Sequence, residues 1–334
     1  MSRLKIRRYY MDRPEDGAAR RLGNRLTRRP IPEFPRTLQI QTVTGCNADC
    51  VFCFYGPTAA TQPKGRMTDD LFLRILEEAS AHPVRRISPY LMNEPLLDRA
   101  IADRIRTIHR VVPDAKVVLT TNGHYLTPDL SETFLDLGGR LHEICVSVQG
   151  TDAPAYARAM RGNMSLERTL ANIDAFEAAR RRRRATRPRL RVTMVDTTLI
   201  DARAALVFWR RRGIEATATV LDNQGGQIEG GDALSRPPMR PFTDCQRLFK
   251  QAYILWNGDV VLCCVDYARR QVLGNVACER LVDVWNGPIA SAIRRRYIDG
   301  AFDRLPLCGS CRVGELRRVV LTTGGGVAVR GAPG

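Results

Sequence analysis

Long apolar segments are absent from this 334-residue sequence. A membrane-spanning helix needs about 20 consecutive, mostly apolar residues, and no stretch of the chain comes near that length. The first residues, MSRLKIRRYYMDRPEDGAARR, are basic and lack the apolar core of a signal peptide. We therefore expect no membrane span and a protein that stays in the cytoplasm.

Lysine is scarce as well. Only four of the 52 basic residues are lysine, so the net charge of +17 comes almost entirely from arginine. The run RRRRR at 180–184 would suit a polyanion, but no aromatic residues are interleaved with it and no nucleic-acid-binding motif accompanies it. We interpret the run as the exposed end of an amphipathic helix and expect no nucleic-acid partner.

A G-x-G-x-x-G motif after the first strand is also missing, which removes the support for dinucleotide binding. Apolar alternation predicts strands at 37–43, 85–91, 115–123, 142–150, 189–197 and 216–223. Helical spacing predicts helices at 67–82, 98–112, 127–138, 165–182 and 201–213. Strands alternating with helices predict an α/β fold with a parallel sheet, either doubly wound or curled into a barrel.

The C-terminal third changes its pattern. Residues 225–241 are rich in Gly and Pro and predict a linker, 251–266 predict a β-hairpin turning at Asn257 and Gly258, and a helix is expected at about 280–297. The resulting division is a basic arm (1–36), an α/β domain (37–225), a linker (226–241), a small α+β domain (242–321) and a loose tail (322–334).

The ten cysteines fall mostly in short spacings, which in a cytosolic chain favours metal binding over disulfides. TGCNADCVFCFYG (44–56) carries Cys46, Cys50 and Cys53 just after the first predicted strand. A structural zinc or an ordinary iron–sulfur cluster takes four protein ligands. Three thiolates on a [4Fe–4S] cubane leave one iron open to a small molecule.

This C-x3-C-x2-C segment after the first strand of a β/α array resembles the signature of the radical S-adenosylmethionine (SAM) superfamily. The resemblance covers about residues 37–225 and implies a partial six-stranded TIM-like barrel. It also implies that the open iron binds SAM and that an electron, delivered by flavodoxin or ferredoxin, cleaves SAM to a 5′-deoxyadenosyl radical. Sites of barrels lie at the C-terminal ends of the strands, where these cysteines fall.

Further segments follow the same family pattern. An aromatic residue precedes the third cysteine, LMNEP stands where the family has a Gly-Gly-Glu-Pro-like segment, TTNG follows the third strand, and ICVSVQG forms the fourth. The resemblance implies that these segments contact SAM through Phe52, Asn93, Glu94, Asn122, Ser147 and Gln149.

The second set of cysteines is Cys245, Cys263, Cys308 and Cys311. Four thiolates close a cluster completely, which suits electron transfer, although they also suit zinc. The segment resembles the Twitch domain, a short relative of the SPASM domain, and implies one auxiliary [4Fe–4S] cluster. Cys264 is expected to point to the opposite strand face from Cys263, so only one of the two can ligate.

One-cluster relatives of this type include dehydrogenases of aminocyclitols and radical epimerases of aminoglycosides. The resemblance therefore implies a carbohydrate-like substrate, a sugar, aminocyclitol or nucleoside, oxidised or epimerised at a C–H bond in secondary metabolism. Epimerisation needs a thiol donor, for which Cys264 comes first, then Cys145 and Cys278.

Polar residues near strand ends are candidate substrate contacts: Arg158, Arg161, Asp196 and Asn223. Two other functions remain open from the sequence: a radical SAM peptide maturase, and a non-catalytic iron–sulfur or nucleic-acid-binding protein.

Overall fold

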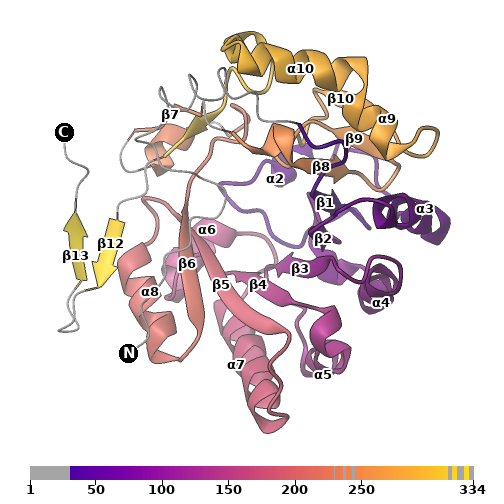
Figure 1. Ribbon diagram of the computed structural model, residues 1–334. Coiled ribbons are helices and arrows are strands. Elements are labelled where there is room, and N and C mark those ends of the chain that lie inside the picture. The colour runs from indigo at the N-terminus through magenta and orange to yellow at the C-terminus, as the bar shows by residue number, and fades with distance from the viewer. Residues whose placement is uncertain are drawn as a thin grey trace.

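A single curved sheet of nine strands organises the molecule, with helices along its outer side (Figure 1). The computed structural model describes residues 31–228, 230–235, 238–242, 245–314, 318–321 and 327–330. The strand order is β10-β9-β8-β1-β2-β3-β4-β5-β6. None of the described helices is long and apolar enough to cross a membrane.

The first six strands are those expected from the sequence. They are β1 (Thr37–Ile40), β2 (Arg86–Ser88), β3 (Lys116–Thr121), β4 (Glu143–Ser147), β5 (Arg189–Asp196) and β6 (Glu215–Val220). Each pairs in parallel with the next along the chain. The predicted parallel sheet is therefore confirmed, and it has the curled form of a partial barrel.

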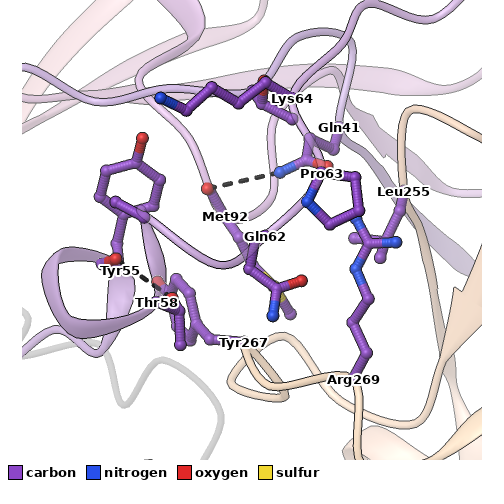
Figure 2. Close-up of a pocket in the computed structure, with 12 residues that line it drawn as sticks. Gln41, Tyr55, Thr58, Gln62, Pro63, Lys64, Met92, Leu255, Tyr267 and Arg269 are labelled. Atoms are coloured by element: carbon purple, nitrogen blue, oxygen red, sulfur yellow. Dashed lines mark hydrogen bonds between the residues drawn. The ribbon is translucent and has the colours of Figure 1, made fainter.

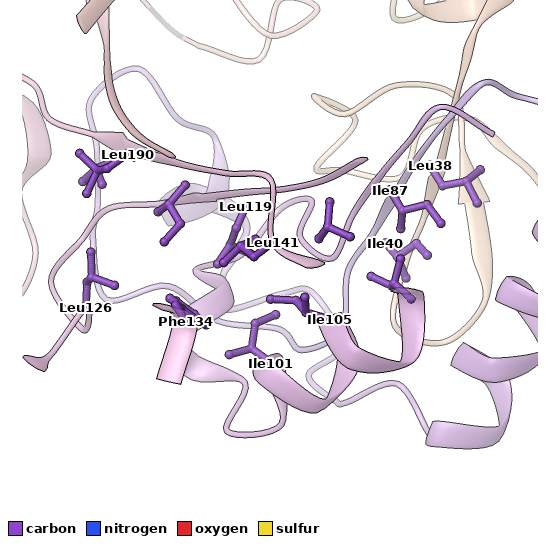
Figure 3. Close-up of a cluster of buried hydrophobic side chains, with 14 of the residues drawn as sticks. Leu38, Ile40, Ile87, Ile101, Ile105, Leu119, Leu126, Phe134, Leu141 and Leu190 are labelled. Carbon is purple, nitrogen blue, oxygen red and sulfur yellow. The ribbon is translucent and has the colours of Figure 1, made fainter. Parts of the chain in front are cut away.

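The five predicted helices are present as α3 (Asp69–Ser80), α4 (Ile101–Val111), α5 (Pro128–Leu137), α7 (Leu166–Arg182) and α8 (Ala202–Arg211). Side chains of Thr68, Thr127, Ser165 and Asp201 cap four of them by accepting backbone N–H groups of the first turn. Their apolar faces pack on the outer face of the sheet, where Leu38, Ile87 and Leu119 meet Ile105 and Phe134 (Figure 3).

The structure adds short elements between the predicted ones: α2 (Tyr55–Thr58), η2 (Pro95–Leu97), η3 (Gly138–Arg140) and α6 (Ala153–Met160). The sequence analysis missed α6. It has only eight residues, and its N-cap Asp152 is followed closely by Pro154. Both residue types are also common in turns, so the local sequence does not distinguish a helix from a turn.

The C-terminal part continues the barrel sheet. Its strands and helices are β8 (Gln251–Ile254), β9 (Asp259–Val261), β10 (Val272–Asn275), α9 (Leu281–Asn286) and α10 (Pro288–Ile298). The predicted hairpin is β8–β9, and β8 pairs in parallel with β1. The single helix predicted at 280–297 is wrong, because Gly287 and Pro288 divide it into α9 and α10.

The remaining described elements are small: η4 (Gly231–Leu234), β7 (Arg240–Pro241), η5 (Arg247–Phe249), η6 (Phe302–Arg304), β11 (Arg312–Val313), β12 (Arg318–Leu321) and β13 (Val327–Arg330). β7 pairs with β11, and β12 pairs with β13. The sequence predicted a loose tail over 322–334, and the described part of that range is strand β13.

Most of the basic arm predicted at 1–36 lies outside the described residues. Its last residues pack on the protein. Phe34 is buried and stacks on His82 at 4.1 Å between ring centres, and the Trp285 indole donates to the Pro32 carbonyl at 2.9 Å. This segment therefore touches both α9 and the loop after α3.

We predict that Ile254→Ala weakens the junction of β1 and β8. Ile254 is fully buried in the strand that joins both parts of the sheet, so truncation should cost about 2–5 kcal/mol. The exposed Ile289 is the matched control, and Ile289→Ala should change stability by less than about 1 kcal/mol. Denaturant midpoints of the anaerobic holoprotein measure both; equal midpoints would contradict the prediction.

Candidate active site

The loop that follows β1 carries Cys46, Cys50 and Cys53, and the C-terminal end of α6 braces it. Asp49 N donates to the Met160 carbonyl at 3.2 Å, and Val51 N donates to the Ala159 carbonyl at 3.1 Å. These main-chain bonds hold the cysteine loop before any metal binds.

Gly162 allows this close approach. Its φ is +70°, and a Cβ there would lie 2.8 Å from the carbonyl oxygen of Asn47. Beside it, Arg161 donates from Nε to the Asp49 carbonyl at 2.8 Å and pairs with the Asp49 carboxylate at 3.3 Å. The structure thus places Arg161, a predicted substrate contact, as a brace of the cysteine loop.

The three thiols of this loop are short of protein partners that would stabilise their charged form. Burial raises the pKa of Cys46 to about 12 and also raises the pKa of Cys50 and Cys53. The thiols also repel one another once charged. A bound cation reverses this cost, because thiolates are the ligands of iron and metal binding displaces their protons. The donor set therefore fits an iron–sulfur cluster.

Glu94 joins three segments at this end of the barrel. Its carboxylate accepts from Thr121 Oγ1 at 2.6 Å, from Asn122 N at 2.8 Å and from Leu96 N at 3.1 Å. Burial raises its pKa to about 7. The Asn122 side chain in turn donates to Asn47 Oδ1 at 2.8 Å, which ties the end of β3 to the cysteine loop.

The other predicted SAM contacts follow β2 and β4. Asn93 accepts from Leu91 N, while its Nδ2 is buried without a partner in the described part of the chain. Gln149 donates to Ser147 Oγ at 3.0 Å and accepts from Val195 N at 2.8 Å. The sixth, Phe52, is partly buried against the core.

The second cysteine set lines one cavity. Cys245, Cys263, Cys308 and Cys311 surround it together with Arg247. Within the described residues, no three cysteine, histidine or carboxylate side chains are arranged to hold a single metal ion. A cubane needs its four thiolates farther apart than a zinc ion does, since each binds a different iron. Four thiols around one cavity fit a cubane cluster that has a thiolate on each iron.

The cysteine doublet lies past the end of β9, in a turn. The prediction that Cys263 and Cys264 lie on opposite faces of a strand is therefore wrong, because neither residue is part of β9. Cys263 still faces the cavity, whereas Cys264 packs against the small apolar cluster that contains Met92 and Tyr253. A hydrogen bond from Cys264, and then the charge of Arg247, lower the pKa of Cys263 despite its burial.

The other two thiols lie elsewhere. Cys145 is buried inside the barrel, 2.9 Å from Arg191 Nη2 and 3.2 Å from Glu143 Oε1. Cys278 is exposed in the outer layer, where Arg74 of α3 donates to the carbonyls on either side of it. The structure does not bring Cys278 to the cysteine loop.

The remaining predicted substrate residues are scattered. Arg158 is exposed on α6, and Asp196 is half-buried at the end of β5. Asn223 donates to the Ser310 carbonyl at 2.9 Å and accepts from Arg312 N at 2.7 Å. It therefore fastens the loop of Cys308 and Cys311 to the end of β6.

Residues that the sequence analysis missed connect the two cysteine sets. Gln224 donates to the Phe52 carbonyl at 3.1 Å and accepts from Phe54 N at 2.8 Å, so it clamps both sides of Cys53. The Tyr267 hydroxyl lies 3.3 Å from Cys53 Sγ. No local pattern marks either residue, because both act on a segment more than 150 positions away.

A pocket opens beside this contact, between the barrel and the C-terminal hairpin (Figure 2). Its cavity volume is about 30 Å³. Tyr55, Gln62 and Lys64 line it together with Tyr267 and Arg269 of the C-terminal part. Gln62 Oε1 is buried and has no hydrogen-bond partner among the described residues, so the pocket offers an unused acceptor.

Two family models match the chain. The radical SAM superfamily matches residues 40–187, and the SPASM iron–sulfur cluster-binding domain matches residues 245–312. The chain therefore carries a radical SAM domain and a C-terminal iron–sulfur cluster-binding domain, and its cofactors are SAM, a [4Fe–4S] cluster and auxiliary iron–sulfur.

Among characterised proteins, the chain is similar to the SAM-dependent 2-deoxy-scyllo-inosamine dehydrogenase of Niallia circulans. The two are 21% identical over 277 residues, which cover 82% of this chain and 91% of the relative. The AdoMet-dependent heme synthase of Methanosarcina barkeri is 32% identical over 151 residues, 43% of this chain and 40% of that protein. The dehydrogenase thus matches across both domains.

Solved structures show the same fold. BtrN in complex with AdoMet and 2-DOIA has a TM-score of 0.60 at 19% identity, covering 83% of this chain and 93% of BtrN. SuiB of Streptococcus suis bound to S-adenosylmethionine has a TM-score of 0.58 at 17% identity, covering 86% and 75%. The partial barrel and its C-terminal extension are therefore shared with both.

Replacing Cys308 and Cys311 together by alanine should remove one cluster and spare the other. We expect iron in the anaerobically reconstituted protein to fall from about eight to about four per chain. Cys278→Ala, which alters an exposed thiol, should keep about eight. Iron and sulfide analysis measures this, and an unchanged iron content in the double variant would contradict the assignment.

SAM binding should strengthen as pH rises through about 7, because Glu94 then becomes the carboxylate that can pair with the ammonium of SAM. Its raised pKa means that it is protonated below this value. Calorimetry of the holoprotein should show about a tenfold lower Kd one to two pH units above the pKa than one below. Glu94→Gln should flatten the profile; the same slope in both proteins would refute the role.

Proposed function

We propose that this enzyme uses a 5′-deoxyadenosyl radical to abstract hydrogen from a C–H bond of a carbohydrate-like molecule and oxidises it. The observation that carries the proposal is the contact of Tyr267 with Cys53. It makes one residue of the C-terminal domain both a wall of the pocket and a neighbour of the SAM-cluster ligand. A substrate in this pocket would lie between the two cysteine sets.

The cofactors and the chain divide the work. When bound, the first cluster supplies the electron that cleaves SAM, and the auxiliary cluster offers a place for the electron that an oxidised substrate gives up. Cys46, Cys50 and Cys53 would hold the first cluster, and Cys245, Cys263, Cys308 and Cys311 the second. Phe52, Asn93, Glu94, Asn122, Ser147 and Gln149 would hold SAM at the ends of β1 to β4.

The pocket chemistry supports a polyhydroxylated or amino-substituted substrate. The amide of Gln62 and the hydroxyl of Tyr55 offer hydrogen bonds of both kinds, and Met92 adds an apolar wall. The similar enzyme from Niallia circulans acts on 2-deoxy-scyllo-inosamine, an aminocyclitol. We extend this substrate class to the present chain, within secondary metabolism. Asp196 stays a candidate contact at the end of β5.

Epimerisation is the second candidate outcome, and Cys264 supports it. This thiol packs against the apolar cluster that contains Met92, a residue that lines the pocket. It could therefore return hydrogen to a substrate radical from the side of the C-terminal domain. Cys145 is less suited, because Glu143 and Arg191 already contact its sulfur.

A peptide maturase is the remaining alternative, supported by the shared fold of SuiB, which is solved bound to the precursor peptide SuiA. We favour the carbohydrate-like substrate, because the similarity to the aminocyclitol dehydrogenase covers 82% of this chain. We propose that flavodoxin or ferredoxin supplies the electron and that the enzyme works in the cytoplasm, where thiols stay reduced.

With SAM, a strong reductant and an aminocyclitol such as 2-deoxy-scyllo-inosamine, the holoenzyme should release 5′-deoxyadenosine and a ketone in equal amounts. Mass spectrometry measures both. Cys264→Ala should leave this oxidation intact, whereas it should abolish any inverted product by removing the hydrogen donor. Cys278→Ala serves as the control for loss of a thiol. Absence of 5′-deoxyadenosine would overturn the proposed function.

A further inference from the structure

A largely buried arginine stands among the auxiliary-cluster cysteines. Arg247 lines the same cavity as Cys245, Cys263, Cys308 and Cys311. Its Nη1 lies 3.8 Å from Cys263 Sγ, and only 17% of its side chain is exposed. Its guanidinium also lies over the ring of Phe242, 6.0 Å from the ring centre.

The partner of this arginine comes from the barrel. Arg247 Nη2 pairs with Asp222 Oδ2 at 3.3 Å, and Asp222 lies just after β6. Asp222 Oδ1 accepts from Gln224 N at 3.1 Å, and the side chain of Gln224 holds the backbone around Cys53. A continuous polar chain therefore runs from an auxiliary-cluster ligand to the loop of the SAM cluster.

The charge on Arg247 matters because of where it lies. A guanidinium stays protonated in proteins, and Coulomb interactions are several times stronger at a poorly solvated site than in water. A cubane held by four thiolates is negative, and reduction adds one more negative charge. A fixed cation beside it stabilises the reduced form and so raises the reduction potential. Asp222 offsets part of this effect.

We propose that Arg247 sets the reduction potential of the auxiliary cluster high enough to accept an electron, and that Asp222 limits the rise. This rests on the proposed function in one respect, that the electron comes from substrate. A substrate carbon radical would lose one electron to the cluster and one proton from its hydroxyl group to solvent, giving a ketone. A ferredoxin- or flavodoxin-type carrier would then reoxidise the cluster.

Redox titration followed by electron paramagnetic resonance tests the inference without substrate. The full chain carrying Cys46→Ala, Cys50→Ala and Cys53→Ala leaves the auxiliary cluster as the sole paramagnetic centre. In this background Arg247→Met should lower the midpoint reduction potential of the auxiliary cluster. At the background protein's midpoint, the ratio of reduced to oxidised cluster should fall about three- to tenfold, and tenfold corresponds to 59 mV.

Three further variants give the expected sign, the control and the charge-conserving change. Asp222→Asn keeps an oxygen for Gln224 but removes the opposing charge, so the midpoint should rise. Arg295→Met alters an exposed arginine of α10 and should leave the midpoint unchanged. Arg247→Lys keeps the charge and should retain most of the potential. If Arg247→Met does not assemble the cluster, Asp222→Asn and Arg247→Lys still decide the sign.

The inference is overturned if Asp222→Asn leaves the midpoint potential of the auxiliary cluster unchanged. It is also overturned if Arg247→Met and Asp222→Asn shift that potential in the same direction. This outcome is distinct from failure of the proposed function. Opposite midpoint shifts together with no ketone from any aminocyclitol would keep the role of Arg247 and reject that substrate class. Ketone formation together with unchanged midpoint potentials would keep the substrate class and reject the role of Arg247.

Discussion

The pairing of β1 with β8 is the constraint on which the site depends. β1 is held on both sides, since Leu38 lies opposite Ile87 of β2 and opposite Ala252 of β8. The cysteine loop leaves from the end of this doubly fixed strand. The hairpin partner of β8 is β9, and the loop between β9 and β10 carries Tyr267. This loop brings the Tyr267 hydroxyl to within 3.3 Å of Cys53 Sγ.

Preorganisation explains the many contacts on a loop of so few residues. Three buried thiols repel one another as thiolates, so the apo loop has little reason to hold them together. Main-chain bonds to the end of α6, the tight approach at Gly162 and the clamp by Gln224 supply that order from outside the loop. The fold thus supports the three ligands through contacts from α6 and from the segment after β6.

Local chemistry explains what the sequence could predict. Thr68 and Thr127 cap helices, and each precedes a segment whose apolar residues recur at helical spacing. The three-cysteine motif is also local, because it lies within one loop. Contacts between distant segments carry no such signal. Asn223 and Arg161 were therefore interpreted as substrate contacts, whereas the structure uses both to brace cysteine loops. The register of β8 on β1 likewise depends on tertiary packing, which periodicity does not encode.

The two cysteine sets have different charged neighbours, because the second set has a largely buried arginine beside one of its thiols. Glu94 and Asp49 act on the thiols of the first set and disfavour added negative charge there. Arg247 acts on Cys263 in the second set and favours it. A cluster among carboxylates is the stronger reductant, as cleavage of SAM requires, and a cluster beside a guanidinium is the better acceptor. In the proposed function, the first cluster would donate the electron that cleaves SAM, and the auxiliary cluster would accept one from the substrate.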